Sequence, residues 1–177
     1  MSKRVVIISG SPRKGGNSET LCDEFLKGCQ EAGHDAVKVC LREKEINFCK
    51  ACYVCRKNGE CFQKDDVPEI LEEMIRADVI VLATPVYFYS MAGQVKTLID
   101  RCLSCGAKLT DKEFYFIATA ADQKAAMERT IEGLRGFTDC LPGARVQGVI
   151  YGAGAWQLGD IQGNPAMAQA YAMGKNI

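Results

Sequence analysis

Four of the ten cysteines are spaced closely enough to act on one ligand. Two residues separate Cys49 from Cys52 and Cys52 from Cys55, and Cys61 follows after a spacer of five. Short spacers let successive thiolates face a common centre, which suits a [4Fe–4S] cluster. Zinc is the alternative, because four thiolates also make a closed tetrahedral site. The twin two-residue spacers favour the cluster, and nearby lysine and arginine side chains would offset its negative charge.

A second chemically specific stretch is Ser9–Thr20, which follows the apolar run Val5–Ile8. Its glycines let the backbone fold closely around an anion, its hydroxyls can donate hydrogen bonds, and Arg13 offers a forked cation. A helix that begins near Asn17 would add free N–H groups and the positive end of its dipole. The stretch therefore predicts a phosphate site, with a ligand-free surface turn as the alternative. It lacks Gly-x-x-x-x-Gly-Lys-Ser/Thr and Gly-x-Gly-x-x-Gly, so neither a nucleoside triphosphate nor a classical dinucleotide is favoured.

Two further segments could complete such a site. In Thr84–Met91 the aromatic side chains could cover a flat ring while backbone groups bond its polar edge. The alternative is that these aromatics plug the core or form a dimer face. For Thr119–Asp122, a ligand role and a plain connection capped by Asp122 are equally compatible with the sequence.

Strands and helices alternate along the chain in a way that brings these segments together. Continuous apolar runs predict buried parallel strands, and the expected strands are Arg4–Ser9, Asp35–Leu41, Asp78–Ala83, Glu113–Thr119 and Val146–Tyr151. Helical spacing or capping signals predict helices over Asn17–Ala32, Asp66–Ala77, Ala92–Cys105, Gln123–Cys140 and Pro165–Met173. The pattern predicts a doubly wound α/β fold with a five-stranded parallel sheet in the order 2-1-3-4-5 and helices on both faces. Ligands would then collect at the carboxyl ends of strands 1, 3 and 4.

Length and composition set wider limits. A chain of 177 residues is expected to form one domain, 1–177, with a cysteine-rich insertion at about 47–65 after the second strand. Lys plus Arg and Asp plus Glu number 22 each, so neither nucleic acid nor an anionic membrane is an expected partner. The short apolar run after Met1–Arg4 is neither a signal peptide nor a membrane span. We therefore expect a cytoplasmic protein with reduced thiols.

The remaining cysteines are expected to pack. Cys102-x-x-Cys105 lies at the end of a predicted helix, whereas a reactive dithiol favours a helix N-terminus, where the thiol pKa falls. Core packing is therefore the favoured interpretation of this pair, and Cys140 is also expected to be buried. His34, the only histidine, follows Gly33 in a turn and is expected at the surface.

Three motifs resemble those of the flavodoxin-like NAD(P)H-dependent FMN reductases and iron–sulfur flavoproteins. Gly10–Ser18 is similar to their phosphate loop, Gly-Ser-Pro-Arg-x-x-Gly-Asn-Ser/Thr. Pro85, Tyr87 and Phe88 match a Pro-x-Tyr segment beside the flavin ring. The cysteines resemble Cys-x2-Cys-x2-Cys-x4–7-Cys, which in that family lies between strand 2 and the following helix.

The resemblance implies FMN as cofactor, a [4Fe–4S] cluster and NAD(P)H as a possible co-substrate. The implied cofactor-binding residues are Ser9, Ser11, Pro12, Arg13, Asn17, Ser18, Thr20, Pro85, Val86, Tyr87, Phe88, Thr119, Ala120 and Asp122. The implied cluster ligands are Cys49, Cys52, Cys55 and Cys61. No acid–base catalytic residue is implied, since the flavin carries the chemistry.

The resemblance also implies a small-molecule or small redox-protein electron donor and acceptor, and a homo-dimer or homo-tetramer. Three alternatives stay open. The cysteines could be free thiols or form a labile disulfide, the chain could be a flavodoxin-type electron shuttle, or it could be a quinone or nitro-group reductase without a cluster.

Overall fold

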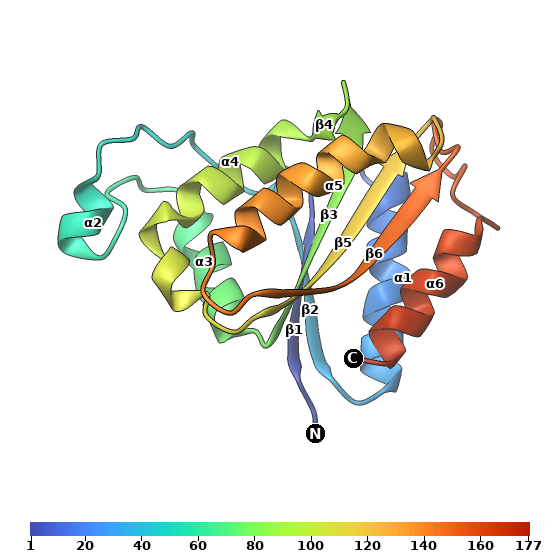
Figure 1. The fold of residues 1–177 in the computed structure, drawn as a ribbon, viewed down its shortest axis with the longest axis horizontal. Helices are drawn as coiled ribbons and strands as arrows, with labels where there is room; N and C mark the ends of the chain where they lie inside the picture. Colours follow the sequence, from blue (N-terminus) through green and yellow to red (C-terminus); the bar gives the residue numbers. More distant parts are fainter.

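The computed structural model describes residues 1–177 and places a twisted parallel sheet between two layers of helices (Figure 1). The parallel strands are β1 (Arg4–Ser9), β2 (Asp35–Cys40), β3 (Val79–Tyr87), β5 (Glu113–Ala120) and β6 (Arg145–Ala153). Their spatial order is β2-β1-β3-β5-β6, and every pair along this path is parallel. Central strands read as unbroken apolar runs because both of their faces are covered by helices. The doubly wound arrangement is thereby confirmed.

The strand count of five is wrong, because the structure has six. The extra strand is β4 (Ser90–Met91), which pairs antiparallel with the end of β3 through Val86 and Tyr87. β3 is also longer than expected and ends at Tyr87 rather than Ala83. A two-residue strand has no room for a side-chain alternation, so its only sequence signal is the turn beside it.

The helices divide between the two faces of the sheet. α1 (Asn17–Glu31) and α6 (Pro165–Lys175) cover one face and lie side by side in Figure 1. The other face carries α3 (Val67–Arg76), α4 (Gly93–Arg101) and α5 (Lys124–Asp139). None of the helices combines the length and hydrophobicity that crossing a bilayer requires.

Alternate residues of each strand supply the two halves of the core. In β1, Val6 and Ile8 pack under α3, α4 and α5, while Val5 and Ile7 pack under α1 and α6. The second half allows unusually close helix contact, because a Cβ atom on Gly174 would stand 2.1 Å from the carbonyl oxygen of Phe25. Glycine is therefore required there for α6 to approach α1.

Two local expectations, on Asp122 and Cys140, prove wrong. Asp66 is the N-cap residue of α3, although its side chain accepts from the backbone N–H of Glu45, at 2.8 Å, and not from the helix. Asp122 accepts from Gln123, and Gln123 rather than Asp122 is the N-cap residue of α5. Cys140 is exposed, since it follows the last turn of α5 and points out of the core.

The cysteine-rich segment 47–65, called the cysteine loop below, projects from the body at the far left of Figure 1 and contains the short helix α2 (Val54–Asn58). One buried ion pair holds both of its ends. Arg101 donates to both carboxylate oxygens of Asp65, at 2.5 and 3.1 Å, and to the backbone oxygen of Asn47 at 2.8 Å. Asp65 also accepts from the N–H groups of Asn47 and Val67. Burial disfavours the charged form of Asp65, but these bonds outweigh it and lower its pKa.

We expect Asp65→Asn to destabilise the protein by about 3 kcal/mol, because the change leaves the Arg101 charge buried without a counterion. The side chains of Asp65 and Arg101 are 0% and 1% exposed. Urea unfolding measured by circular dichroism gives the free energy of unfolding. The matched control is Asp100→Asn on the same helix as Arg101. Its exposed pair with Lys96 is expected to contribute under about 0.5 kcal/mol.

The double variant Asp65→Asn/Arg101→Met is expected to regain part of the loss, since it removes the unpaired charge. Equal destabilisation by Asp65→Asn and Asp100→Asn would contradict this interpretation.

Candidate functional site

A pocket of about 290 Å³ lies at the carboxyl ends of β1, β3 and β5, where the strand order reverses. Loops from four places in the chain meet there. Its lining residues are Ser11, Arg13, Gly16, Asn17, Ser18, Pro85, Val86, Tyr87, Phe88, Tyr89, Thr119, Ala120, Ala121, Asp122, Ala126, Ala155, Trp156 and Leu158.

The loop between β1 and α1 presents polar groups to this pocket. Ser11 Oγ donates to the backbone oxygen of Arg13 at 2.8 Å, which curls the loop. A Cβ atom on Gly16 would stand 2.2 Å from that same hydroxyl, so only glycine fits at the turn into α1. No side chain caps α1, and its first N–H groups have no partner within the helix. Ser18 Oγ is buried beside them without a hydrogen-bond partner. These features suit an anion.

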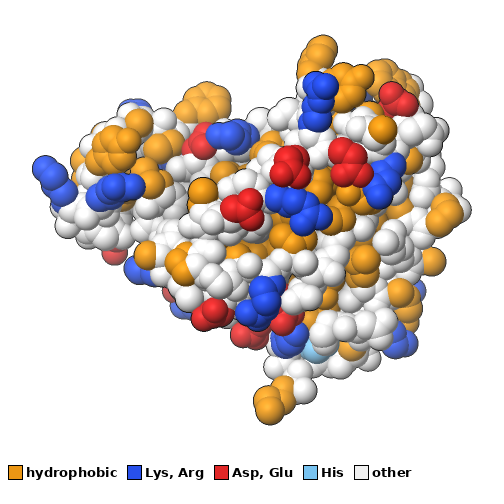
Figure 2. Space-filling model, viewed as in Figure 1, with side chains coloured by type: hydrophobic (Ala, Val, Ile, Leu, Met, Phe, Trp, Pro, Cys, Tyr) orange, Lys and Arg blue, Asp and Glu red, His pale blue; other side chains and the backbone are white.

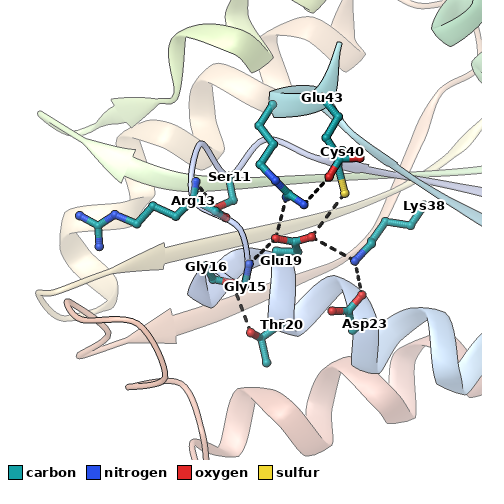
Figure 3. A network of polar contacts seen from close by, with 11 residues as sticks. Ser11, Arg13, Gly15, Gly16, Glu19, Thr20, Asp23, Lys38, Cys40 and Glu43 are labelled. Atoms are coloured by element: carbon teal, nitrogen blue, oxygen red, sulfur yellow. Dashed lines mark hydrogen bonds and ion pairs between the residues drawn. The ribbon is translucent and has the colours of Figure 1, made fainter.

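Glu19, which the sequence analysis did not single out, holds this loop in place (Figure 3). Its buried carboxylate accepts from the N–H of Gly15 at 2.8 Å, Arg42 at 2.7 Å, Lys38 at 3.3 Å and the Cys40 thiol at 3.4 Å. Burial opposes the charge of Glu19, but the hydrogen bonds from Arg42 and the other donors lower its pKa. The sequence signal was a glutamate three residues after the N-cap glycine, a position from which such side chains reach back to the loop.

The hairpin of β3 and β4 forms the aromatic wall of the pocket. Phe88 and Tyr89 make its two-residue turn, and both have positive φ, at 49° and 61°. Thr84 fixes the base of the hairpin, since its hydroxyl accepts from the N–H of Ala92 at 2.9 Å. Phe88 is fully exposed, so its ring is free to contact a ligand.

A loop after β6 closes the remaining side, and its contribution was not predicted from the sequence. Trp156 and Leu158 line the pocket although both side chains are largely exposed. The signal was the chain's single tryptophan in a glycine-bearing loop. Asn17 ties this loop down, because it donates to the backbone oxygen of Gln157 at 2.8 Å and accepts from the N–H of Ile161. Arg13 donates to the Trp156 carbonyl at 3.3 Å.

The structure brings together most of the predicted cofactor-binding residues. Those that line the pocket are Ser11, Arg13, Asn17, Ser18, Pro85, Val86, Tyr87, Phe88, Thr119, Ala120 and Asp122. Ser9, Pro12 and Thr20 do not line it. Ser9 is buried at the end of β1, and Thr20 instead donates to the backbone oxygen of Gly16 within α1.

The predicted cluster ligands lie apart from the pocket in the cysteine loop. Cys52 is exposed, and Cys49, Cys55 and Cys61 are partly exposed, so none of the four is needed for core packing. No three His, Cys, Asp or Glu side chains of the chain are gathered closely enough to hold a metal ion. The four free thiols are suitable ligands for a cluster. In this conformation, however, their sulfur atoms do not surround one common point.

The surface of the cysteine loop is both basic and apolar. Figure 2 shows it as a lobe at the left, where hydrophobic and cationic side chains lie together. Its exposed rings are Phe48, Tyr53 and Phe62, and Lys50 lies over the ring of Phe62 at 5.7 Å.

Comparisons with known proteins agree with these features. The profile of the NADPH-dependent FMN reductase family matches residues 3–156. An iron-sulfur flavoprotein of Methanocaldococcus jannaschii is 39% identical over 136 residues, which cover 76% of this chain and 70% of that protein. One of Methanosarcina thermophila is 31% identical over 173 residues, 96% of this chain and 87% of the relative.

Among solved structures, an azoreductase from Bacillus anthracis superposes with a TM-score of 0.78 at 16% identity and covers both chains completely. An NAD(P)H:quinone oxidoreductase from Methanothermobacter marburgensis gives 0.75 at 18% identity, covering 99% of this chain and 97% of the other. These similarities show the flavodoxin-like fold. Together with the family match, they establish that the chain belongs to the NADPH-dependent FMN reductase family and is an FMN-dependent oxidoreductase.

Proposed function

We propose that this protein takes electrons from NAD(P)H and passes them to a small acceptor, with FMN in the pocket and a [4Fe–4S] cluster in the cysteine loop. The observation that carries the proposal is the meeting of an uncapped helix terminus and an aromatic hairpin in one pocket. The first suits a phosphate and the second a flat ring, which are the two ends of FMN.

The phosphate end would be held by the loop after β1. Ser11 and Ser18 supply hydroxyls, and the Ser18 hydroxyl is buried with no other partner. The free N–H groups at the start of α1 add donors and the positive end of the helix dipole. Arg13 supplies the one cationic side chain among the lining residues.

The ring end would lie between the hairpin and the loop after β6. Tyr87 and Phe88 on one side and Trp156 on the other line the pocket with exposed aromatic rings that would cover the flavin. FMN itself supplies the hydride and single-electron chemistry when bound. Asp122 is the only carboxylate that lines the pocket, and it is engaged with the N–H of Gln123, so the protein's part is binding and orientation.

The cysteine loop would hold the cluster through Cys49, Cys52, Cys55 and Cys61. All four thiols are free, lie within one segment and are not used in the core. Lys50, Arg56 and Lys57 would offset the negative charge of a thiolate-bound cluster. The ion pair between Arg101 and Asp65 keeps the two ends of the loop together, which limits how far the sulfurs can separate.

The function is tested by turnover under anaerobic conditions. We expect the purified protein with FMN to oxidise NADH or NADPH when a quinone is supplied, at a rate well above that of free FMN at the same concentration. Absorbance of the reduced nicotinamide is the measurement. Oxidation of neither nucleotide, with reduction of the flavin only by a small redox protein, would favour an electron shuttle instead.

Arg13→Ala is expected to weaken FMN binding about 10- to 100-fold, the effect of losing a hydrogen bond to a charged group. Quenching of FMN fluorescence on titration with apoprotein measures the affinity. Lys14→Ala is the matched control, because Lys14 is adjacent and exposed but does not line the pocket. Its effect is expected to stay below about threefold. Equal losses would argue for general charge attraction rather than a defined phosphate contact.

Serine at Cys49, Cys52, Cys55 or Cys61 is expected to lower bound iron and sulfide after anaerobic purification, because each removes one thiolate ligand. Chemical iron and sulfide analysis and the visible spectrum are the measurements. Cys140→Ser, at an exposed cysteine outside the loop, should leave the content unchanged. A spectrum of the parent protein with flavin bands alone, without iron or labile sulfide, would contradict the cluster assignment. One zinc ion per chain would instead support a zinc site at these cysteines.

A further inference from the structure

Two cysteines outside the flavin pocket and the cysteine loop form a separate feature. Cys102 and Cys105 follow α4 in the turn Cys102–Ser104, which leads into a second turn, Gly106–Lys108. Both are buried, at 3% and 6% exposure. Neither is required by the proposed flavin chemistry.

The backbone already holds this pair in a geometry that a disulfide can span. The N–H of Cys105 donates to the carbonyl of Cys102 at 3.0 Å, and the Ser104 hydroxyl donates to the carbonyl of Arg101 at 3.1 Å. A turn closed in this way brings its first and fourth Cα atoms within about 7 Å. A disulfide joins Cα atoms about 4.4–6.8 Å apart, so the main distance requirement is met.

The two thiols also differ in their surroundings. Cys105 lines a cleft of about 440 Å³ between α3, the end of α4 and the cysteine loop, together with Lys108 and Cys61, whereas Cys102 does not line it. The interaction with the Cys102 thiol lowers the pKa of Cys105, and the interaction with Cys105 together with burial raises the pKa of Cys102. Cys105 therefore borders the cleft and is the thiol favoured as the thiolate, whereas Cys102 does not border the cleft.

We propose that Cys102 and Cys105 form a dithiol site that reduces low-molecular-weight disulfides entering this cleft. The site departs from a helix-N-terminal dithiol, because a neighbouring thiol rather than a helix dipole stabilises the thiolate. Cys105 is the attacking residue and Cys102 the resolving residue.

The reaction is a two-step exchange that balances. The Cys105 thiolate attacks one sulfur of the small disulfide, whose S–S bond breaks, and one small thiolate leaves. The Cys102 thiol then loses its proton and attacks the Cys105 sulfur of the mixed disulfide, which releases the second small thiolate. Two electrons pass from the protein to the small disulfide, and the products are two small thiols and a Cys102–Cys105 disulfide.

The other buried cysteines lack these features and serve as internal controls. Cys22 and Cys29 lie in the core under α1 and line none of the larger pockets. Burial raises the pKa of both thiols, that of Cys29 to about 12. They should stay reduced in the folded protein.

Trypsin separates the relevant thiols, which makes the test specific. Cleavage after Arg101 and Lys108 yields peptide 102–108, with both cysteines of the pair and no other. Peptide 58–64 carries Cys61 alone, and peptides 15–27 and 28–38 carry Cys22 and Cys29. The folded, reduced protein is treated with oxidised glutathione, its free thiols are alkylated during unfolding, and the digest is analysed without reductant.

We expect peptide 102–108 to lose two hydrogens in the majority of molecules, while the Cys22 and Cys29 peptides stay fully alkylated. In Cys102→Ser, peptide 102–108 should instead carry one glutathione, because the mixed disulfide on Cys105 cannot be resolved. In Cys105→Ser, the same peptide should carry none, because Cys102 does not reach the cleft.

Two results would overturn the proposal. One is a peptide 102–108 that stays doubly alkylated, and the other is a disulfide that joins it to peptide 58–64, which would make Cys61 the partner. The parent protein decides between these outcomes by itself, so the test holds even if a serine variant fails to fold. It needs neither FMN nor iron, and its failure would leave the proposed function untouched.

Discussion

The loop between β1 and α1 depends on one buried carboxylate. Glu19 is 5% exposed, and it joins the backbone of Gly15 to Lys38 of β2 and to Arg42 just beyond that strand. A negative charge three residues into α1 would oppose a phosphate at the same terminus if it stood alone. Its two cations neutralise it, so it can fix the loop while the helix dipole stays available to an anion.

A second buried ion pair holds the cysteine loop in place, as Glu19 holds the loop between β1 and α1. Arg101 and Asp65 lie at the base of the cysteine loop, where they make a bidentate contact and also bind the backbone at both ends of the loop. The loop beyond them is exposed, and its thiols take no part in core packing. None of the four thiols belongs to either half of the hydrophobic core.

Local sequence patterns predicted the features that depend on residues close together in the chain. The apolar run of β1 predicted its bounds, and the glycine-rich turn after it supplies Ser11, Arg13, Gly16, Asn17 and Ser18 to the pocket lining. What the sequence could not predict depends on partners distant in the chain. Asn17 bonds to a loop about 140 residues away, and Trp156 reaches the pocket only because that loop folds back. Likewise, only Cys105 of the Cys102 and Cys105 pair lines the cleft beside α3, which the spacing of the two cysteines does not indicate.

The turn at Phe88 and Tyr89 departs from the usual sequence preference of such turns, and it does so beside the pocket. A two-residue hairpin turn with positive φ at both positions favours Asn-Gly, yet Phe88 and Tyr89 occupy it here. Each bulky residue in that conformation costs on the order of 1 kcal/mol. Phe88 recovers none of this through packing, since its side chain is fully exposed. Neither β-sheet pairing nor the core accounts for an aromatic residue there, which is consistent with the proposed flavin contact at the mouth of the pocket.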